Sequence, residues 1–247
     1  MALFKVCCWY TNYKLVFSDT QLGGFMKVLI VYWHPEPKSF NGAMLNQAQE
    51  TLRAAGHEIK VSNLHEMNFN PVSGRHNFDS TSNAEYFKQQ MEEIYATDNN
   101  TFSSEIETEL QKIEWCDLMI WQFPLWWFSV PAMLKGWVDR VFAMKRVYGG
   151  GREYYQGAFK GKKAMLSFTC GASEEMFQPG GLNGDLNGVL KPIHRGMLQF
   201  PGFDVLEPHV VYSPARISDE DRQRELKRYA HRLEHIEKED TIEIGDY

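Results

Sequence analysis

The chain has 247 residues, of which 43% are hydrophobic and 23% are charged, and its formal net charge is −6. This length and composition fit a globular protein of one large domain or two small ones, with ample chain for a core. The negative charge argues against nucleic acid or an anionic membrane surface as the main partner. No run approaches the roughly 18 apolar residues of a membrane span, so we do not expect a membrane protein.

The four cysteines, Cys7, Cys8, Cys116 and Cys170, show no metal-ligand spacing. Cys7 and Cys8 are adjacent in the chain and make a poor disulfide candidate. Few thiols without a disulfide framework are typical of a reducing compartment. We therefore expect a cytoplasmic protein with no metal site.

The first 25 residues differ from the rest of the chain. Their apolar start is interrupted by Asn12 and Lys14, which argues against the continuous apolar core of a signal peptide. A glycine pair then separates them from a clear strand. We predict a weakly ordered extension or start-site artefact over 1–25, a domain over 26–237 and a C-terminal tail over 238–247.

The domain begins with a strand, a loop and a helix. Residues 28–33 form an apolar run rich in β-branched side chains, which is typical of a strand buried on both faces. Two prolines discourage helix in the loop 34–38, and Ser39 can cap a helix over 40–55. Alternating apolar and charged residues over 58–61 predict a second strand and hence a parallel β–α–β crossover.

The middle of the chain contains a long polar segment followed by two helices and a strand. Residues 62–83 are rich in turn formers, and a loop of this length inside a domain is usually functional or interfacial. The pattern predicts helices over 84–96 and 102–115. An apolar run over 116–121 predicts the third strand.

The stretch 121–137 contains four tryptophans and two phenylalanines. With Pro124 and Pro131, it predicts a strand end, a rigid aromatic turn and a helix that continues to Met144. An ordinary core explains any single ring as well as a ligand platform does. The density of rings favours a platform, because loops that leave the carboxyl end of a strand are where an α/β sheet holds flat ligands.

The last third of the chain completes the alternation of strands and helices. We predict a fourth strand over 164–169, a loop over 170–173 and a helix over 186–198. Residues 203–212 contain a fifth strand, and a charged final helix covers 218–237. Five strands alternating with helices predict a doubly wound five-stranded parallel sheet with helices on both faces.

The ligand crevice of such a sheet lies outside the carboxyl ends of its strands. Three loops should meet there, over 34–41, 122–128 and 169–173. The first lacks the G-x-G-x-x-G pattern of dehydrogenase Rossmann folds, but it ends at a helix N-terminus whose free N–H groups suit a phosphate. A phosphate pocket, an aromatic platform and a Thr-Cys-Gly backbone loop together predict a flavin site of the flavodoxin-like type.

Several motifs occur in the order found in one known family. The segments that carry the likeness are His34, 39–41, 67–71, 122–125, 127–128, 130–137, 184–185 and 202–206. The most specific is Gln-Phe-Pro-Leu at 122–125 with Val-Pro-Ala-Met-Leu-Lys-Gly-Trp at 130–137. From Met26 to about Leu233 the chain resembles the flavodoxin-like NAD(P)H:quinone oxidoreductases, the DT-diaphorase group, in its bacterial form.

This resemblance implies a two-electron oxidoreductase that binds FAD rather than FMN, takes electrons from NAD(P)H and passes them to quinones by a ping-pong route. It also implies a homodimer with active sites at the subunit interface. The residues that would hold the cofactor are His34, Lys38, Ser39, Phe40, Asn41, Pro124, Leu125, Trp127, Phe128, Thr169, Cys170, Gly171, Ala172 and Arg222. The first five would contact the pyrophosphate and neighbouring groups, and the next four the isoalloxazine ring.

The chain departs from the family pattern on the substrate side of the site. The loop after the fourth strand, usually Thr-Thr-Gly-Gly, reads Thr-Cys-Gly-Ala over 169–172. A family tyrosine that helps to stabilise charge on the reduced ring is Phe177 here, and a histidine that assists it in the vertebrate enzymes is Asn183. Tyr148 is either a substrate contact or a loop aromatic that covers the core. We expect a slower but active reductase.

Two alternatives remain open at this point. Some relatives are flavin-binding regulatory subunits of potassium-efflux antiporters, and FMN-dependent azoreductases use the same fold. Co-purification with a membrane antiporter would favour the first alternative. Extraction and mass measurement of the cofactor would separate FAD from FMN.

Overall fold

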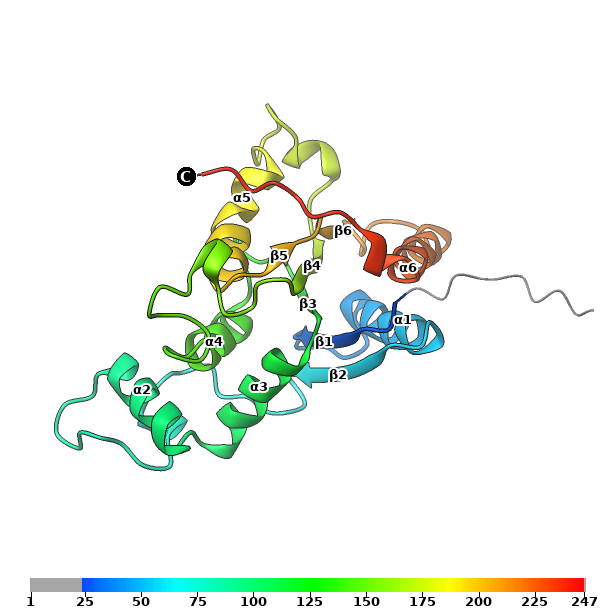
Figure 1. Cartoon of the computed structure of the whole chain (residues 1–247). Coiled ribbons are helices and arrows are strands. Elements are labelled where there is room, and N and C mark those ends of the chain that lie inside the picture. Colours follow the sequence, from blue (N-terminus) through cyan, green and yellow to red (C-terminus); the bar gives the residue numbers. More distant parts are fainter. Residues whose placement is uncertain (1–23, 247) are drawn as a thin grey trace, which may run out of the picture.

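A parallel β-sheet between two layers of helices forms the centre of the computed structural model, which describes residues 24–246 (Figure 1). The strands are β1 (Lys27–Tyr32), β2 (Glu58–Asn63), β3 (Leu118–Pro124), β4 (Lys163–Cys170), β5 (Asp204–Val205) and β6 (His209–Tyr212). The helices are α1 (Phe40–Ala54), α2 (Gln89–Asn99), α3 (Ser104–Trp115), α4 (Ala132–Val141), α5 (Leu186–Ile193) and α6 (Asp219–Leu233). Residues 1–23 of the predicted extension lie outside the described residues.

The strand order confirms the doubly wound arrangement. It runs β2-β1-β3-β4-β5, every pairing is parallel, and β6 also pairs with β4. The chain therefore moves outward from β1 to β2 and then returns past β1 to β3, which makes the β1/β3 boundary the switch point of the sheet. Tyr32 pairs with Gln122, and Gln122 pairs with Ser167, so β1, β3 and β4 end at nearly the same level.

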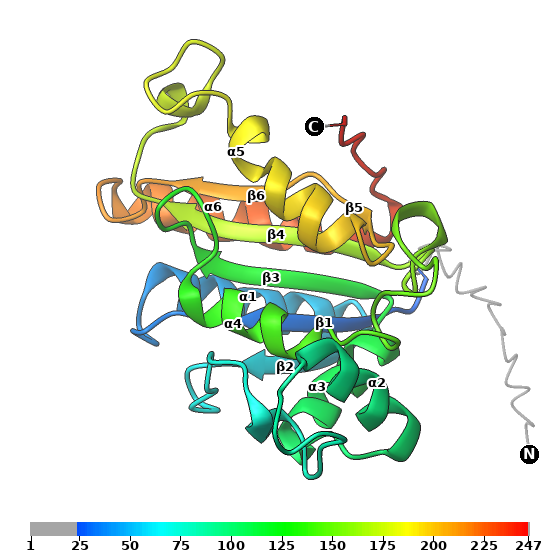
Figure 2. The same cartoon turned by 90° about the vertical axis from the view of Figure 1, so that its left-hand side faces the viewer.

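Helices cover both faces of the sheet (Figures 1 and 2). Val28 and Ile30 of β1 pack toward α1 and α6, whereas Leu29 and Val31 pack toward the core that includes α3, α4 and α5. All four side chains are fully buried, which explains why the strand reads as a continuous apolar run. Among the helices of residues 24–246, none has both the length and the apolar composition that a membrane span requires.

Residues 203–212 do not form the single fifth strand that we expected beside β4. That position in the sheet is filled by two short strands, because β5 pairs with the start of β4 and β6 pairs with its end. Pro208 lies directly before β6, and proline has no N–H for the ladder. Beyond β5, the Ile242 N–H donates to the Val205 carbonyl oxygen at 2.8 Å, so the C-terminal tail covers part of this edge.

The N-terminal boundary predicted for the helix over 84–96 is wrong. The observed helix, α2, begins five residues later, at Gln89. Local side-chain hydrogen bonds hold the preceding residues in a turn. The Asn83 side-chain oxygen accepts the N–H groups of Glu85 and Tyr86, each at 3.0 Å, and the Glu92 carboxylate accepts the N–H groups of Ser82 and Asn83. Such bonds compete with the first turn of a helix.

Two further predicted boundaries are corrected around the aromatic stretch and in the last third. β3 continues to Pro124 instead of ending at Trp121, because residues 122–124 pair with β4. The helix predicted over 186–198 changes at His194 into a turn of π-helix, η4 (His194–Gln199). Pro192 lies just before that change and cannot donate a helical hydrogen bond.

Candidate active site

The candidate site is a crevice at the carboxyl ends of β1, β3 and β4. It consists of two adjoining pockets of about 630 and 730 Å³ that share His34, Thr169, Pro214 and Ala215. The first pocket, of 630 Å³, borders the aromatic segment after β3. The second, of 730 Å³, borders the start of α1. The crevice thus lies beside the switch point of the sheet, where this architecture binds its ligands.

Most of the residues that we predicted to hold a cofactor line these two pockets. They are His34, Lys38, Ser39, Phe40, Asn41, Pro124, Leu125, Trp127, Thr169, Cys170, Gly171 and Arg222. Phe128 and Ala172 follow lining residues in the chain but are not on the pocket walls. Lining residues that our prediction missed include Trp126, Ser213, Pro214, Ala215 and Arg216. The last four form the loop after β6, and a Ser-Pro turn directly after a strand was the available signal.

The N-terminus of α1 borders the second pocket and suits an anion. The Ser39 hydroxyl caps the helix by accepting the Gly42 N–H at 3.2 Å. A Cβ atom at position 42 would lie 2.0 Å from the Pro37 carbonyl oxygen, so the loop packs this closely on the helix only with glycine there. Lys38 is exposed and forms no ion pair within residues 24–246. Its charge and the helix dipole both favour a negative group in this pocket.

His34 presents one ring nitrogen to the crevice. Its Nδ1 lies 2.9 Å from the backbone nitrogen of Glu36 and 3.0 Å from the carbonyl oxygen of that residue. The backbone therefore occupies Nδ1, and Nε2 is the ring nitrogen left for a ligand. Partial burial lowers the pKa of His34, which favours the neutral ring. A neutral ring with its proton on Nε2 can donate to a phosphate oxygen.

A buried hydrogen-bond network joins the start of α1 to two strands beneath the crevice. The Asn41 amide nitrogen donates to the Thr169 hydroxyl at 2.7 Å, and the Gln122 amide nitrogen donates to the Asn41 side-chain oxygen at 2.8 Å. The Ser167 hydroxyl donates to the Gln122 side-chain oxygen at 2.7 Å. All four residues are buried, so each bond replaces one that water would otherwise make.

Replacing Gln122 with leucine should lower the free energy of unfolding by about 2 kcal/mol. The substitution keeps the volume but leaves the Asn41 side-chain oxygen and the Ser167 hydroxyl without their partner. Urea unfolding of the variant measures the loss. Gln47→Leu is the control, because the side chain of that glutamine bonds to Thr51 one turn further along the same helix, and its loss should cost much less. Equal losses in the two variants would contradict the importance of the network.

The aromatic segment after β3 forms a tight turn with two adjacent residues in the left-handed region. Trp127 has φ 51° and Phe128 has φ 59°, between reciprocal backbone hydrogen bonds that join Trp126 and Ser129. Side chains rarely adopt this conformation, and such strain is concentrated at functional sites. Trp127 is 94% exposed. The Trp33 ring packs edge-on against Trp126 at 5.1 Å and supports the base of the turn.

The loop after β4 places backbone groups at the wall of the first pocket. Cys170 is buried, and its Sγ donates to the Ala172 carbonyl oxygen at 3.4 Å. Burial raises the pKa of the Cys170 thiol, which therefore stays protonated and is a poor nucleophile. A Cβ built at Gly171 would meet no atom of residues 24–246 within 4 Å, so this part of the loop leaves room for a ligand.

The Phe177 ring packs against Phe128 of the aromatic turn. The ring is 7% exposed, and its centroid lies 6.1 Å from that of Phe128 and 6.4 Å from that of Tyr212. The backbone N–H of Asn183 donates to the Met176 carbonyl oxygen at 2.8 Å, so Asn183 closes the loop that carries Phe177. The structure therefore brings these two candidate substrate-side residues to the same end of the sheet as the crevice.

Tyr148 does not line the crevice of its own chain. Its ring centroid lies 5.9 Å from that of Phe200, and its hydroxyl accepts a hydrogen bond from Gln90 at 3.1 Å. Phe200 precedes β5, whose first residue, Asp204, pairs with Lys163 at the start of β4. Tyr148 is therefore placed toward the amino ends of the strands, away from Phe177 and Asn183.

Arg222 lines the second pocket and holds its wall in place. Its guanidinium group donates to the carbonyl oxygens of Pro214 at 3.0 Å and Ile217 at 2.7 Å, and it pairs with Asp219. Arg222 thus shapes the loop after β6, which borders both pockets. Its own charge is largely balanced by Asp219, in contrast to Lys38.

Comparisons with known proteins agree with this geometry. A family model described as a flavodoxin-like fold matches residues 26–234. The ribosyldihydronicotinamide dehydrogenase [quinone] of Rattus norvegicus is 43% identical over 217 residues, which is 87% of this chain and 94% of that protein. NAD(P)H dehydrogenase [quinone] 1 of the same species is 40% identical, over 87% of this chain and 79% of that protein.

A solved structure is also similar over most of the chain. It is a Klebsiella pneumoniae protein provisionally described as a quinone reductase, with 39% identity and a TM-score of 0.85, covering 88% of this chain and 87% of that one. An FMN-dependent NADH-azoreductase from Bacillus anthracis has 15% identity and a TM-score of 0.57, which shows a shared fold alone. The chain therefore belongs to the flavodoxin-like family of NAD(P)H:quinone oxidoreductases.

Proposed function

We propose that the chain is an FAD-dependent NAD(P)H:quinone oxidoreductase that works by a ping-pong route. The observation that carries this proposal is the pair of adjoining pockets, one at a helix N-terminus and one at an aromatic turn. Relatives that are 40–43% identical over 87% of the chain are named as quinone-type dehydrogenases, which supports the same class of reaction here.

The second pocket fits the pyrophosphate part of the cofactor. Lys38 would contribute a positive charge that the described part of the chain leaves unbalanced, and the Nε2 atom of His34 would contribute a donor. The N-terminus of α1 borders the same pocket, so its first N–H groups would be available to the phosphates. Asn41 would act mainly through its bonds to Gln122 and Thr169, which hold the helix start against the strands.

The first pocket fits a flat tricyclic ring. Its walls combine Pro124, Leu125 and Trp127 with the backbone of Gly171, and its volume of about 630 Å³ is within the usual range for cofactor sites. A bound flavin supplies the two-electron chemistry between the reduced nicotinamide and the quinone. The apolar walls would exclude water and stack the reactants, and backbone N–H groups near Gly171 would stabilise negative charge at the polar edge of the ring.

The hydride donor is a reduced nicotinamide in this proposal. The names of the relatives include two kinds of donor, NAD(P)H and ribosyldihydronicotinamide, which carry the same reactive ring. Steady-state rates with NADH, NADPH and ribosyldihydronicotinamide as alternative donors would assign the preference.

We also propose a homodimer in a reducing cellular compartment. Trp127 is 94% exposed and Phe128 49% exposed in a single chain, and adjacent bare aromatic side chains usually mark a contact surface. In a dimer with its sites at the interface, Tyr148 of one chain could reach the crevice of the other. Sedimentation equilibrium measures the assembly, and a monomer at micromolar concentration would contradict the homodimer.

Cys116 and Cys170 are free thiols, which suits a reducing compartment.

The function is tested by identifying the cofactor and its reaction together. We expect the purified protein to release FAD on acid denaturation, close to one per chain by mass spectrometry and absorbance. Double-reciprocal plots at several quinone concentrations should be parallel, as a ping-pong route requires. Release of FMN would overturn the cofactor assignment, and absence of quinone reduction by the flavin-loaded protein would overturn the enzymatic function.

A further inference from the structure

Two histidines and a glutamate gather at the C-terminal end of α6, away from the crevice. His231 and His235 are four residues apart and lie on one side of the helix end, with Glu234 beside them. The His231 Nδ1 is 3.7 Å from the Glu234 Oε2, and the two imidazole centroids are 5.0 Å apart. One ligand atom from each of the three residues lies within 4.8 Å of the other two.

The backbone fixes the tautomer of one of the two imidazole rings. The His235 Nδ1 lies 3.0 Å from the carbonyl oxygen of His231. Because a carbonyl oxygen can only accept, this contact requires the proton on Nδ1 and leaves the lone pair of the neutral ring on Nε2. Histidines that bind metals commonly donate their other ring N–H to a backbone carbonyl in this way.

The electrostatic surroundings of the three residues also favour a cation. The helical bounds of α6 end at Leu233, so the negative end of the helix dipole lies beside the cluster. Glu234 adds a negative charge. The nearby Arg232 pairs with Glu239 at 2.7 Å, which compensates its positive charge. The cluster residues are exposed, so water can complete the coordination of a bound ion.

We propose that His231, Glu234 and His235 bind a divalent transition-metal ion, for which Zn²⁺ is the test ion. Tetrahedral Zn²⁺ with bonds of about 2.0 Å places neighbouring ligand atoms about 3.3 Å apart, so small side-chain rotations complete the site. Along the axis, about 14 Å separate His231 from Arg222, which lines the second pocket. The bound ion would stabilise the C-terminal end of α6 and would take no part in the reaction at the crevice.

Zinc titration of the full chain without an affinity tag tests the proposal. Competition with a chromogenic zinc indicator should reveal a site whose affinity falls roughly tenfold or more in His231→Gln and in His235→Gln, because each variant loses one of three ligands. The matched control is His65→Gln, which removes an exposed histidine elsewhere and should leave the affinity unchanged.

Thermal unfolding provides a second readout, since an ion that binds only the folded chain raises its melting temperature. Zn²⁺ should raise the melting temperature of the native chain and of His65→Gln more than that of the other two variants. Equal zinc affinity and equal thermal shifts in all four proteins would overturn the proposal. Failure of the native chain to bind Zn²⁺ in competition with the indicator would also overturn it.

Discussion

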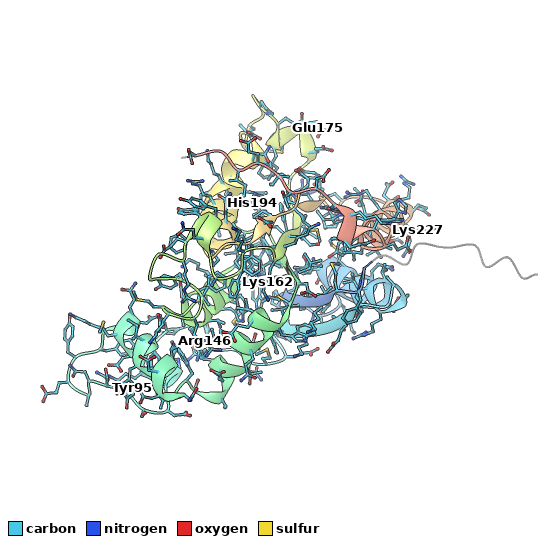
Figure 3. The ribbon with its side chains drawn as sticks, viewed as in Figure 1. Tyr95, Arg146, Lys162, Glu175, His194 and Lys227 are labelled. Carbon is cyan, nitrogen blue, oxygen red and sulfur yellow. The ribbon has the colours of Figure 1, made fainter. Side chains whose placement is uncertain are left out.

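Acidification from pH 7 to pH 5 should lower the free energy of unfolding by about 4 kcal/mol, because two buried histidines must stay neutral in the folded chain. His209 in β6 is fully buried, and neither of its ring nitrogens has a hydrogen-bond partner within residues 24–246. Its ring stacks on Tyr229 with the centroids 4.3 Å apart. His194, labelled in Figure 3, is 2% exposed, and its Nε2 also has no hydrogen-bond partner in the described part of the chain.

The direction of this effect follows from the pKa values of the two rings. Burial, reinforced by the charges of Arg228 and Arg232, lowers the pKa of His209 to about 2. Burial lowers the pKa of His194 to about 4. Both rings titrate near 6.5 in the unfolded chain, so their contribution is fully present above that pH and is lost as the pH falls toward the folded pKa values. At pH 5 each ring accounts for about 2 kcal/mol of the loss.

Urea unfolding at pH 7 and pH 5 measures the effect. In His209→Phe, which keeps an aromatic ring against Tyr229, the loss between the two pH values should be about 2 kcal/mol smaller than in the native chain. The exposed His65 serves as the control, since His65→Gln should retain the full loss. An identical pH dependence in His209→Phe and the native chain would show that His209 is not the titrating group.

Turnover with NADPH and a quinone should rise roughly ten- to a hundredfold in Phe177→Tyr. The family resemblance implies a tyrosine hydroxyl at this position, and the Phe177 ring lies 6.1 Å from Phe128 of the aromatic turn. One added preorganised donor contributes about 1–3 kcal/mol where negative charge develops, and each 1.4 kcal/mol corresponds to a factor of about ten. This expectation rests on the proposed function.

Anaerobic stopped-flow measurement of flavin reduction by NADPH isolates the affected step. Tyr212→Phe is the control, because it removes a hydroxyl from a ring that neighbours Phe177 but does not line either crevice pocket. Its rate should stay at the native value. A Phe177→Tyr variant with native stability and an unchanged reduction rate would show that the missing hydroxyl does not limit this enzyme.

The parts of the site that were predictable from the sequence are local ones. His34, Ser39 and Asn41 lie within eight residues, from the end of an apolar strand to the first turn of a capped helix, so one segment of sequence places them side by side. The loop from Ser213 to Arg216 was missed because its place depends on long-range contacts. The Ser213 N–H donates to the Cys170 carbonyl oxygen at 2.7 Å, and Arg222 holds the loop from the other side.

The sequence by itself determined which segments become strands, which helix begins beneath the crevice and which rings gather after β3. These features depend on apolar periodicity, helix capping and turn residues, all of which act over a few positions. Only the tertiary structure decided that Tyr148 lies far from Phe177 and that the fifth strand position of the sheet is divided at Pro208. Those outcomes depend on backbone geometry and on contacts such as that between Asn41 and Thr169, which are 128 positions apart, and no local pattern encodes such contacts.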